Sequence, residues 1–163
     1  MKPRPSAGKR VLPLIGWREW VQLPEFRIEA IKAKVDSGAK TSTLHAFDLE
    51  YFEQSGTTWT RFSIHPWQRR DTPSCIAEAE VTDFRLVRSS NGSLERRPVV
   101  RTSVILMGQT LSIELTLTNR DQMGFRMLLG RQAIRNRFVI DAGRSFYSMT
   151  LPEPGCSAKR LNP

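Results

Sequence analysis

Apolar and polar residues alternate at every second position over much of the chain. The clearest row is residues 111–118, where Leu and Ile are separated by Ser, Glu and Thr. Similar rows cover residues 77–82 and 100–106, and a less regular one covers 28–35. A period of two places apolar side chains on one face of an extended strand and polar ones on the other. We therefore expect β-strands over all of these segments.

Helical spacing is confined to two short segments. Residues 131–137 directly follow Gly130 and predict a short helix, whereas residues 43–51 fit either a weak helix or a turn followed by a strand. Asn91-Gly92 lies between two extended segments and is typical of the positive-φ turns that close β-hairpins. No internal repeat is present. The pattern predicts an all-β barrel or sandwich with one short helix.

Length and composition point to one globular domain with tails. The chain has 163 residues, of which 39% are hydrophobic and 25% are charged, and a formal net charge of +9. These values are ordinary for a single domain, apart from the basic charge. We expect a basic flexible tail at residues 1–10, one domain at 11–150 and a flexible tail at 151–163.

The apolar runs are too short for a membrane span, and no secretory signal is recognisable. We therefore expect no membrane association and a cytoplasmic location. The chain has two cysteines, Cys75 and Cys156, far apart in the sequence. One disulfide is arithmetically available, but nothing resembles a disulfide framework, so we expect two free thiols in a reducing compartment.

The first candidate for chemistry is the triplet Asp36-Ser37-Gly38 at the end of a predicted strand. An acid at a strand end, a small hydroxyl residue and a glycine that permits close backbone approach can form a catalytic loop. The same triplet also forms ordinary turns, so by itself it is weak evidence for catalysis.

A second segment strengthens the case. Residues 127–130 form an apolar strand ending in Gly130, followed by Arg131 and the predicted helix. An early strand-Asp-Ser-Gly and a late apolar-Gly-Arg-helix together resemble the two-part signature of a retropepsin-like aspartic protease lobe. The hairpin at residues 88–93 lies between the two motifs, where such a lobe has its flap.

The blocks 34–46, 87–92, 95–100 and 116–131 resemble a bacterial family historically labelled ATP-dependent zinc proteases. Its members are RimB-like, retropepsin-like aspartic proteases, and some are associated with a RimK-type ligase that adds glutamates to a ribosomal protein. The resemblance spans residues 14–150. It implies a closed β-barrel lobe, an aspartic endopeptidase activity and a protein or peptide substrate.

The resemblance also implies roles for particular residues. It assigns catalysis to Asp36, Ser37 and Gly38. It implies substrate contacts from the segment after this loop and from the flap: Ala39, Lys40, Thr41, Arg88, Ser89, Ser90, Asn91 and Gly92. It places four residues beside the active loop as structural support: Leu128, Leu129, Gly130 and Arg131.

The older family label implies zinc and ATP, and the residues support neither. The H-E-x-x-H motif is absent, the two histidines, His45 and His65, have no metal-ligand spacing, and the cysteines form no C-x-x-C pair. The P-loop pattern is also incomplete around Gly38 and Lys40. We expect no cofactor and no metal.

An aspartic protease needs two carboxylates that share one proton. The chain contains one Asp-Ser-Gly, and Asp141-Ala142-Gly143 lacks the hydroxyl and a later strand-Gly-helix unit, so it is interpreted as a turn. Asp36 must then meet Asp36 of a second chain, which predicts a C2 homodimer.

One residue departs from the usual retropepsin pattern. Lys40 occupies a position that is acidic in many retropepsins and pairs there with the arginine of the late Gly-Arg. This puts the usual dimer contacts in doubt and leaves Arg131 without that partner. It also places positive charge beside the groove, which suits an acidic or glutamate-modified substrate.

Two other functions fit the sequence. The first is a non-catalytic module that binds a peptide, such as a ribosomal protein tail, in the same groove. The second is a basic ribosome- or RNA-associated domain, which ranks last because no RNA-binding motif accompanies the charge. The arginines around the hairpin fit either a clamp for acidic groups or a solvated edge: Arg85, Arg88, Arg96, Arg97 and Arg101.

Overall fold

The computed structural model describes residues 10–89, 91–119, 124–148 and 154–157. Strands dominate it, in the order β1 (Leu14–Gly16), β2 (Arg18–Leu23), β3 (Ile28–Asp36), β4 (Ser42–His45), β5 (Phe47–Gln54), β6 (Thr57–Ile64), β7 (Cys75–Arg88), β8 (Leu94–Leu106), β9 (Gln109–Thr118), β10 (Met127–Gly130), β11 (Val139–Asp141) and β12 (Gly155–Cys156). A 3-10 turn, η1 (Pro24–Phe26), precedes β3, and one short helix, α1 (Arg131–Ile134), follows β10. The all-β class with one short helix is confirmed.

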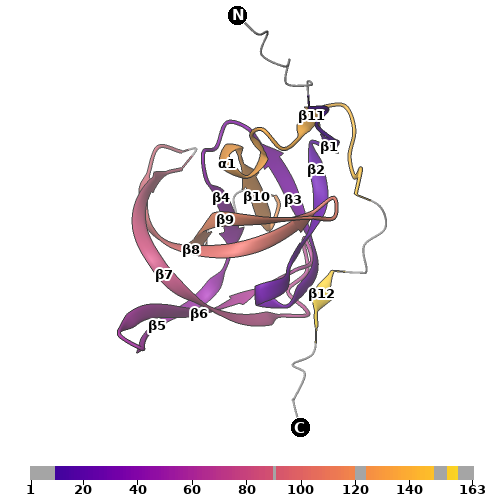
Figure 1. The fold of residues 1–163 in the computed structure, drawn as a ribbon. Helices are drawn as coiled ribbons and strands as arrows, with labels where there is room; N and C mark the ends of the chain where they lie inside the picture. Colours follow the sequence, from indigo (N-terminus) through magenta and orange to yellow (C-terminus); the bar gives the residue numbers. More distant parts are fainter. Residues whose placement is uncertain (1–9, 90, 120–123, 149–153, 158–163) are drawn as a thin grey trace, which may run out of the picture.

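The main sheet curls into a ring (Figure 1). Its hydrogen-bonded order is β12-β3-β10-β4-β9-β8-β7-β6-β5, and β2 pairs with both β3 and β8. The pairing of β2 with β8 rests on Gln22↔Ile105 alone, so the ring is not a regular closed barrel. Beyond β8 the sheet continues through β7 and β6 to β5 as an arm (Figure 1). β1 and β11 form a separate parallel pair.

The core lies inside this ring, where the apolar faces of the strands meet. Along β9, Leu111, Ile113, Leu115 and Leu117 are all buried, as their alternation predicts. Phe26 and Phe62 meet edge to face with ring centroids 5.3 Å apart, which joins η1 to the arm. Among the described residues, no helix has the length and apolar character to cross a membrane.

The structure decides between the two alternatives for residues 43–51 and shortens the predicted helix after Gly130. Of the alternatives for residues 43–51 the helix is wrong, because β4 and β5 occupy this segment and meet at Ala46. All four residues of β4 are buried, and the strand lies between β10 and β9 in the sheet. The helix after Gly130 ends at Ile134 rather than at residue 137, where Asn136 takes a left-handed φ of 63°.

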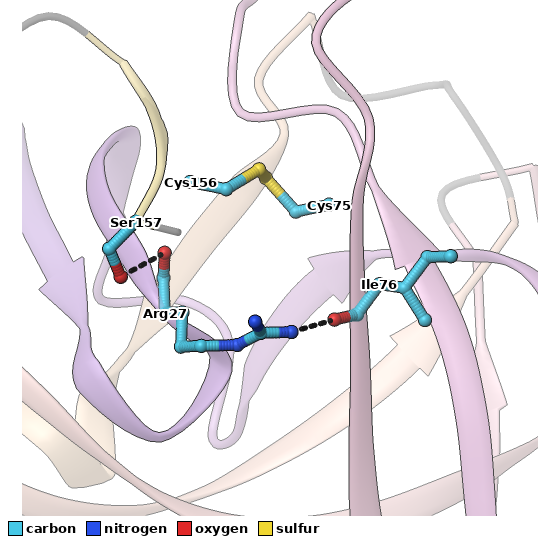
Figure 2. Close-up of a disulfide and its surroundings, with 5 residues drawn as sticks. All are labelled: Arg27, Cys75, Ile76, Cys156 and Ser157. Carbon is cyan, nitrogen blue, oxygen red and sulfur yellow. Dashed lines mark hydrogen bonds between the residues drawn. A yellow bond between two sulfur atoms is a disulfide. The ribbon is translucent and has the colours of Figure 1, made fainter. Parts of the chain in front are cut away.

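The expectation of free thiols is wrong, because Cys75 and Cys156 form a disulfide (Figure 2). Their Cα atoms are 5.8 Å apart, within the usual range for a bridge. β12 pairs with the start of β3, and the Ser157 N–H donates to the Arg27 carbonyl at 2.8 Å. Part of the segment that we expected to be a flexible tail, 151–163, is thus held against the sheet. Sequence spacing does not reveal this proximity, because the two cysteines are 81 residues apart.

Candidate active site

Asp36 is the last residue of β3 and begins a tight turn. Its Oδ1 accepts a hydrogen bond from the Gly38 N–H at 3.0 Å, and its carbonyl accepts one from the Ala39 N–H at 3.3 Å. Asp and Gly favour such a reversal, because the Asp side chain can bond to backbone two residues on. The Asp36 side chain remains partly exposed. The turn therefore presents one carboxylate at the end of a buried strand.

Gly130, at the end of β10, allows β10 to pack directly against the backbone of residues 41 and 42, just after this turn. β10 runs parallel to β3 with Gly130 opposite Asp36. A Cβ at Gly130 would lie 2.5 Å from the Thr41 carbonyl carbon and 2.9 Å from the Ser42 nitrogen, both of them backbone atoms. Its N–H donates to Ser42 Oγ at 3.0 Å. Glycine is thus required here for a close backbone approach.

The start of α1 fixes the backbone of the Asp36 loop. The Arg131 N–H donates to the Ala39 carbonyl at 2.7 Å, and the Gln132 N–H donates to the Lys40 carbonyl at 3.1 Å. The Arg131 guanidinium donates to the Ser37 carbonyl at 3.0 Å. In many retropepsins this arginine pairs with an acidic residue at the position of Lys40. Here the Ser37 carbonyl is its partner instead. Arg131 braces the loop through its backbone.

A groove of about 670 Å³ opens beside Asp36. Its lining comes from the Asp36 loop, from β10, from the two threonine-bearing strands β4 and β9, and from the β7–β8 hairpin. The Thr43 and Thr116 hydroxyls form a hydrogen bond at 3.0 Å, and the Thr116 hydroxyl also contacts the Ser42 carbonyl oxygen at 3.3 Å. These bonds tie β4 to β9 beneath the groove, so its wall is a fixed sheet surface.

The turn of the β7–β8 hairpin is held by its own backbone and side chains. The Gly92 N–H donates to the Ser89 carbonyl at 2.9 Å, with Gly92 at φ 84°. The Asn91 side-chain oxygen accepts the Ser93 N–H at 3.1 Å, and Arg88 Nη1 donates to the Gly92 carbonyl at 2.9 Å. Asn91 and Gly92 therefore act in the turn and are not among the described residues that line the groove.

Positive charge dominates the groove. Two of its arginines are paired with carboxylates: Arg85 with Glu114 and Asp83, and Arg97 with Glu95 at 2.9 Å. The hydrogen bond from Arg85 holds the pKa of Glu114 below its ordinary value. Lys34 and Lys40 also line the groove and have no ion pair with another described residue. Asp36 is the single carboxylate among the described lining residues.

Asp141 lies in a similar turn away from the groove. The Gly143 N–H donates to Asp141 Oδ1 at 2.9 Å, and the Tyr147 hydroxyl donates to Oδ2. These two bonds, the Tyr147 bond first, hold the pKa of Asp141 below its ordinary value. Both carboxylate oxygens are thus occupied, which agrees with the interpretation of this triplet as a turn.

The described residues offer no group of three or more His, Cys, Asp or Glu side chains placed to hold a metal ion. The geometry places the Asp36 carboxylate at an open groove. A carboxylate of this kind can act as a general base or acid toward water and a peptide carbonyl.

Comparison with known proteins agrees with this geometry. Residues 14–150 match the family model described as RimB-like, the retropepsin-like aspartic endopeptidase RimB. The chain belongs to the RimB-like family.

Relatives of this RimB-like chain include two proteins named "Probable alpha-L-glutamate ligase". The one from Shewanella halifaxensis is 44% identical over 133 residues, which are 82% of this chain and 29% of the relative. The one from Desulfotalea psychrophila is 48% identical over 130 residues, which are 78% of this chain and 28% of the relative. The chain therefore spans less than a third of the length of these relatives.

A solved structure shares the fold. The Legionella pneumophila protein Lpg0085, described as a protein of unknown function, superposes with a TM-score of 0.69 at 27% identity. The match covers 83% of this chain and 97% of that one.

The groove of this RimB-like chain brings together eight of the residues expected at the site: Asp36, Gly38, Ala39, Lys40, Thr41, Arg88, Ser89 and Leu128. Leu129 is fully buried, and Gly130 and Arg131 support the loop as described above. Ser37 contributes its carbonyl to Arg131 and is not among the described lining residues. Ser90 lies outside the described residues.

Sequence reasoning missed part of the lining. Lys34, Thr43, Thr116 and Thr118 line the groove, as do Leu86 and Val87. Of the arginines offered as a clamp, Arg85, Arg88 and Arg97 line the groove, whereas Arg96 and Arg101 are not among its described lining residues. The exposed alternation of β3 could have indicated Lys34, two residues before Asp36. The threonines could not be found in this way, because they meet only through the long-range pairing of β4 with β9.

Proposed function

We propose that the protein is a homodimeric aspartic endopeptidase of the retropepsin type that cleaves an acidic protein or peptide. One observation carries the proposal: Asp36 stands on a loop braced by β10 and α1, and it opens into a groove large enough for a peptide under the β7–β8 hairpin. Family membership supports the same reaction class.

The chemistry requires a second chain. The described part of the groove contains one carboxylate, and the reaction needs a pair that shares one proton. In a C2 dimer the two Asp36 side chains would supply that pair. The ionised carboxylate takes a proton from water, which attacks the peptide carbonyl, while the protonated partner donates to the carbonyl oxygen. Collapse of the resulting diol then transfers a proton to the leaving nitrogen and breaks the C–N bond.

The substrate class follows from charge. Lys34 and Lys40 flank Asp36 and have no ion pair among the described residues, so they can receive carboxylates of a substrate. The relatives named for glutamate ligation also support a glutamate-bearing substrate. A glutamate-modified ribosomal protein tail is one such substrate.

A second candidate is a peptide-binding module without catalysis. The single Asp36 among the described groove residues, beside two lysines, favours this alternative if the chain does not dimerise. Such a module would bind acidic peptides in the groove and release them unchanged.

The deciding experiment combines light scattering with a cleavage assay. We expect a dimer over a wide concentration range and cleavage of acidic peptides, detected by mass spectrometry, that is lost in Asp36→Asn without loss of fold or dimer. Cleavage that persists in Asp36→Asn contradicts the peptidase proposal. A monomer that binds the peptides, and yields no product on long incubation, establishes the binding module.

A further inference from the structure

A second positively charged surface lies outside the groove, on the outer side of β2 and β3. We call it the β2–β3 face and define it by three cations, Arg18 on β2 and Lys32 and Lys34 on β3. Lys34 also lines the groove. The face therefore begins where the groove ends, and one extended chain can contact both.

The three cations have no carboxylate partner among the residues that the structure describes. Arg18 is the register partner of Lys34, and residues directly opposite on antiparallel strands project from the same side. Burial lowers the pKa of Lys32, and the charges of Arg18 and Arg69 lower it further. Arg18 Nε donates to the neutral Ser145 hydroxyl at 3.0 Å, which leaves its charge uncompensated. Since opposed like charges destabilise a sheet, this arrangement indicates an anionic partner.

Aromatic rings hold two of these cations in place. Trp20 and Phe146 stack with centroids 5.6 Å apart and planes at 21°. The Lys32 ammonium lies 5.3 Å from the Trp20 centroid and 5.8 Å from that of Phe146. The Arg18 guanidinium lies 5.0 Å from the Phe146 centroid. Cation–π contacts of this kind orient the charges before any ligand arrives, which reduces the entropy that binding must overcome.

We propose that the β2–β3 face is an exosite that binds acidic side chains of the polypeptide whose neighbouring segment occupies the groove. This inference rests on the proposed function, because it assumes that the bound polypeptide runs from the groove to the β2–β3 face across Lys34, which belongs to both surfaces. A polypeptide fits better than a nucleic acid, since stacking of Trp20 on Phe146 and of cations on both rings leaves little ring surface for bases.

The test measures binding separately from cleavage. The full chain carrying Asp36→Asn is titrated into fluorescent peptides of alternating Glu and Ser, about 6 and about 20 residues long. At roughly 3.3 Å per residue the longer peptide can contact more of the groove and of the β2–β3 face at once. We expect the longer peptide to bind about tenfold more tightly. Lys32→Gln should raise its Kd about threefold and Lys32→Glu about tenfold, with a smaller change for the 6-residue peptide.

Arg61→Gln is the charge-matched control. Arg61 lies on β6 and pairs with Glu78 at 2.7 Å, and it does not line the groove among the described residues. Arg61→Gln removes the same formal charge as Lys32→Gln. Equal losses in Lys32→Gln and Arg61→Gln would mean that net charge alone attracts the peptide, and would overturn the exosite. Tighter binding of a single-stranded RNA of matched charge, lost in Lys32→Glu, would overturn the polypeptide assignment.

The outcomes also separate this inference from the proposed function. Lys32-dependent binding of the long peptide, without cleavage by the unsubstituted chain, supports the exosite and contradicts the peptidase. Cleavage that is equally efficient for both peptide lengths and insensitive to Lys32→Glu supports the peptidase and contradicts the exosite.

Discussion

The chain contains two Asp-x-Gly turns whose local geometry is almost the same. Asp36 and Asp141 each end a strand, and each accepts the N–H of the glycine two residues on, at 3.0 and 2.9 Å. Each also has a glycine as its parallel register partner, Gly130 for Asp36 and Gly16 for Asp141. The turn itself therefore does not distinguish a candidate catalytic acid from a structural one.

The surroundings make the difference. Asp36 lines the groove, and its loop is braced from outside by backbone bonds to α1. Asp141 has its second oxygen occupied by the Tyr147 hydroxyl. The segment that follows Asp141 is held by Glu19, a fully buried carboxylate. The comparison teaches that an Asp-x-Gly triplet becomes a candidate for catalysis only where the fold leaves an oxygen open to a groove.

The largest expected effect is on activity. If the two turns differ as described, Asp36→Asn lowers kcat/KM about a thousandfold or more, because the substitution removes the general acid–base group. Asp141→Asn keeps it within about twofold, because Asp141 is not among the described residues of the groove. Steady-state cleavage of an acidic peptide checks both. Equal losses in the two variants would remove the distinction between the turns.

The next effect is on stability and concerns the two register-partner glycines. A Cβ at Gly130 would lie 2.5 Å from the Thr41 carbonyl carbon, and one at Gly16 would lie 2.4 Å from the Arg144 carbonyl oxygen. Neither backbone can move without disturbing its turn, so Gly130→Ala and Gly16→Ala should each cost about 3 kcal/mol in the free energy of unfolding.

Gly143→Ala is the matched control for this prediction. Its Cβ would meet only the Asp141 side chain, at 3.4 Å, which is an ordinary contact. We expect a change of about 0.5 kcal/mol or less. Urea unfolding followed by tryptophan fluorescence measures all three variants. If Gly130→Ala is as stable as Gly143→Ala, the close crossing beside Asp36 is not a constraint on the loop.

These glycines also show how far the sequence can predict this fold. The late Gly130-Arg131 was recognisable, because it follows an apolar strand and precedes a helical stretch. The glycine that matches Asp141 was missed, because it comes before Asp141 in the chain, at Gly16, rather than after it. Period-two alternation located most strands, since it depends on local burial. Parallel partners are set by long-range pairing, which local pattern does not encode.

The same limit applies to the candidate site and to the cysteines. Asp36 and its loop were predictable from a contiguous motif, and family resemblance added Arg88 and Ser89. Thr43 and Thr116 are 73 residues apart and meet only in the folded sheet. The Cys75–Cys156 bridge depends likewise on β12 returning to β3. Contacts between segments that are distant in the sequence are therefore the features of the site and fold that local residue patterns could not predict.

Glu19 provides a test of how the second turn is held. Its Oε1 accepts the N–H groups of Gly16 and Tyr147, each at 2.7 Å, and its Oε2 accepts the Ser148 N–H at 3.0 Å and the Ser148 hydroxyl at 2.6 Å. Glu19→Gln would place an NH₂ group against two donors in a buried site. We expect a loss of about 2 kcal/mol in the free energy of unfolding.

Urea unfolding and limited proteolysis check the Glu19 prediction together. Faster cleavage within residues 141–148 should accompany the loss of stability, because the segment loses its anchor. The fold around Asp36 should keep its protection from hydrogen exchange, since Glu19 does not contact that loop. A loss of protection in both turns would show that the two are not independently held.

The smallest expected effect concerns the hydrogen bond from the Tyr147 hydroxyl to the Asp141 carboxylate. Its hydrogen bond is the main cause that holds the pKa of Asp141 below the ordinary value of 3.8. A lowered pKa means that the ionised carboxylate stabilises the fold above pH 3.8, and that this contribution is lost as the pH falls through the lowered pKa. Tyr147→Phe should raise the pKa of Asp141 toward 3.8, with the Gly143 N–H bond keeping it somewhat below. Carboxyl-carbon NMR titration measures the change directly, and thermal unfolding should show the difference from the unsubstituted protein shrinking as the pH falls below 3.8. A pKa of Asp141 that does not move in Tyr147→Phe would mean that the hydroxyl does not bind the carboxylate, and the contrast with Asp36 would then rest on the groove alone.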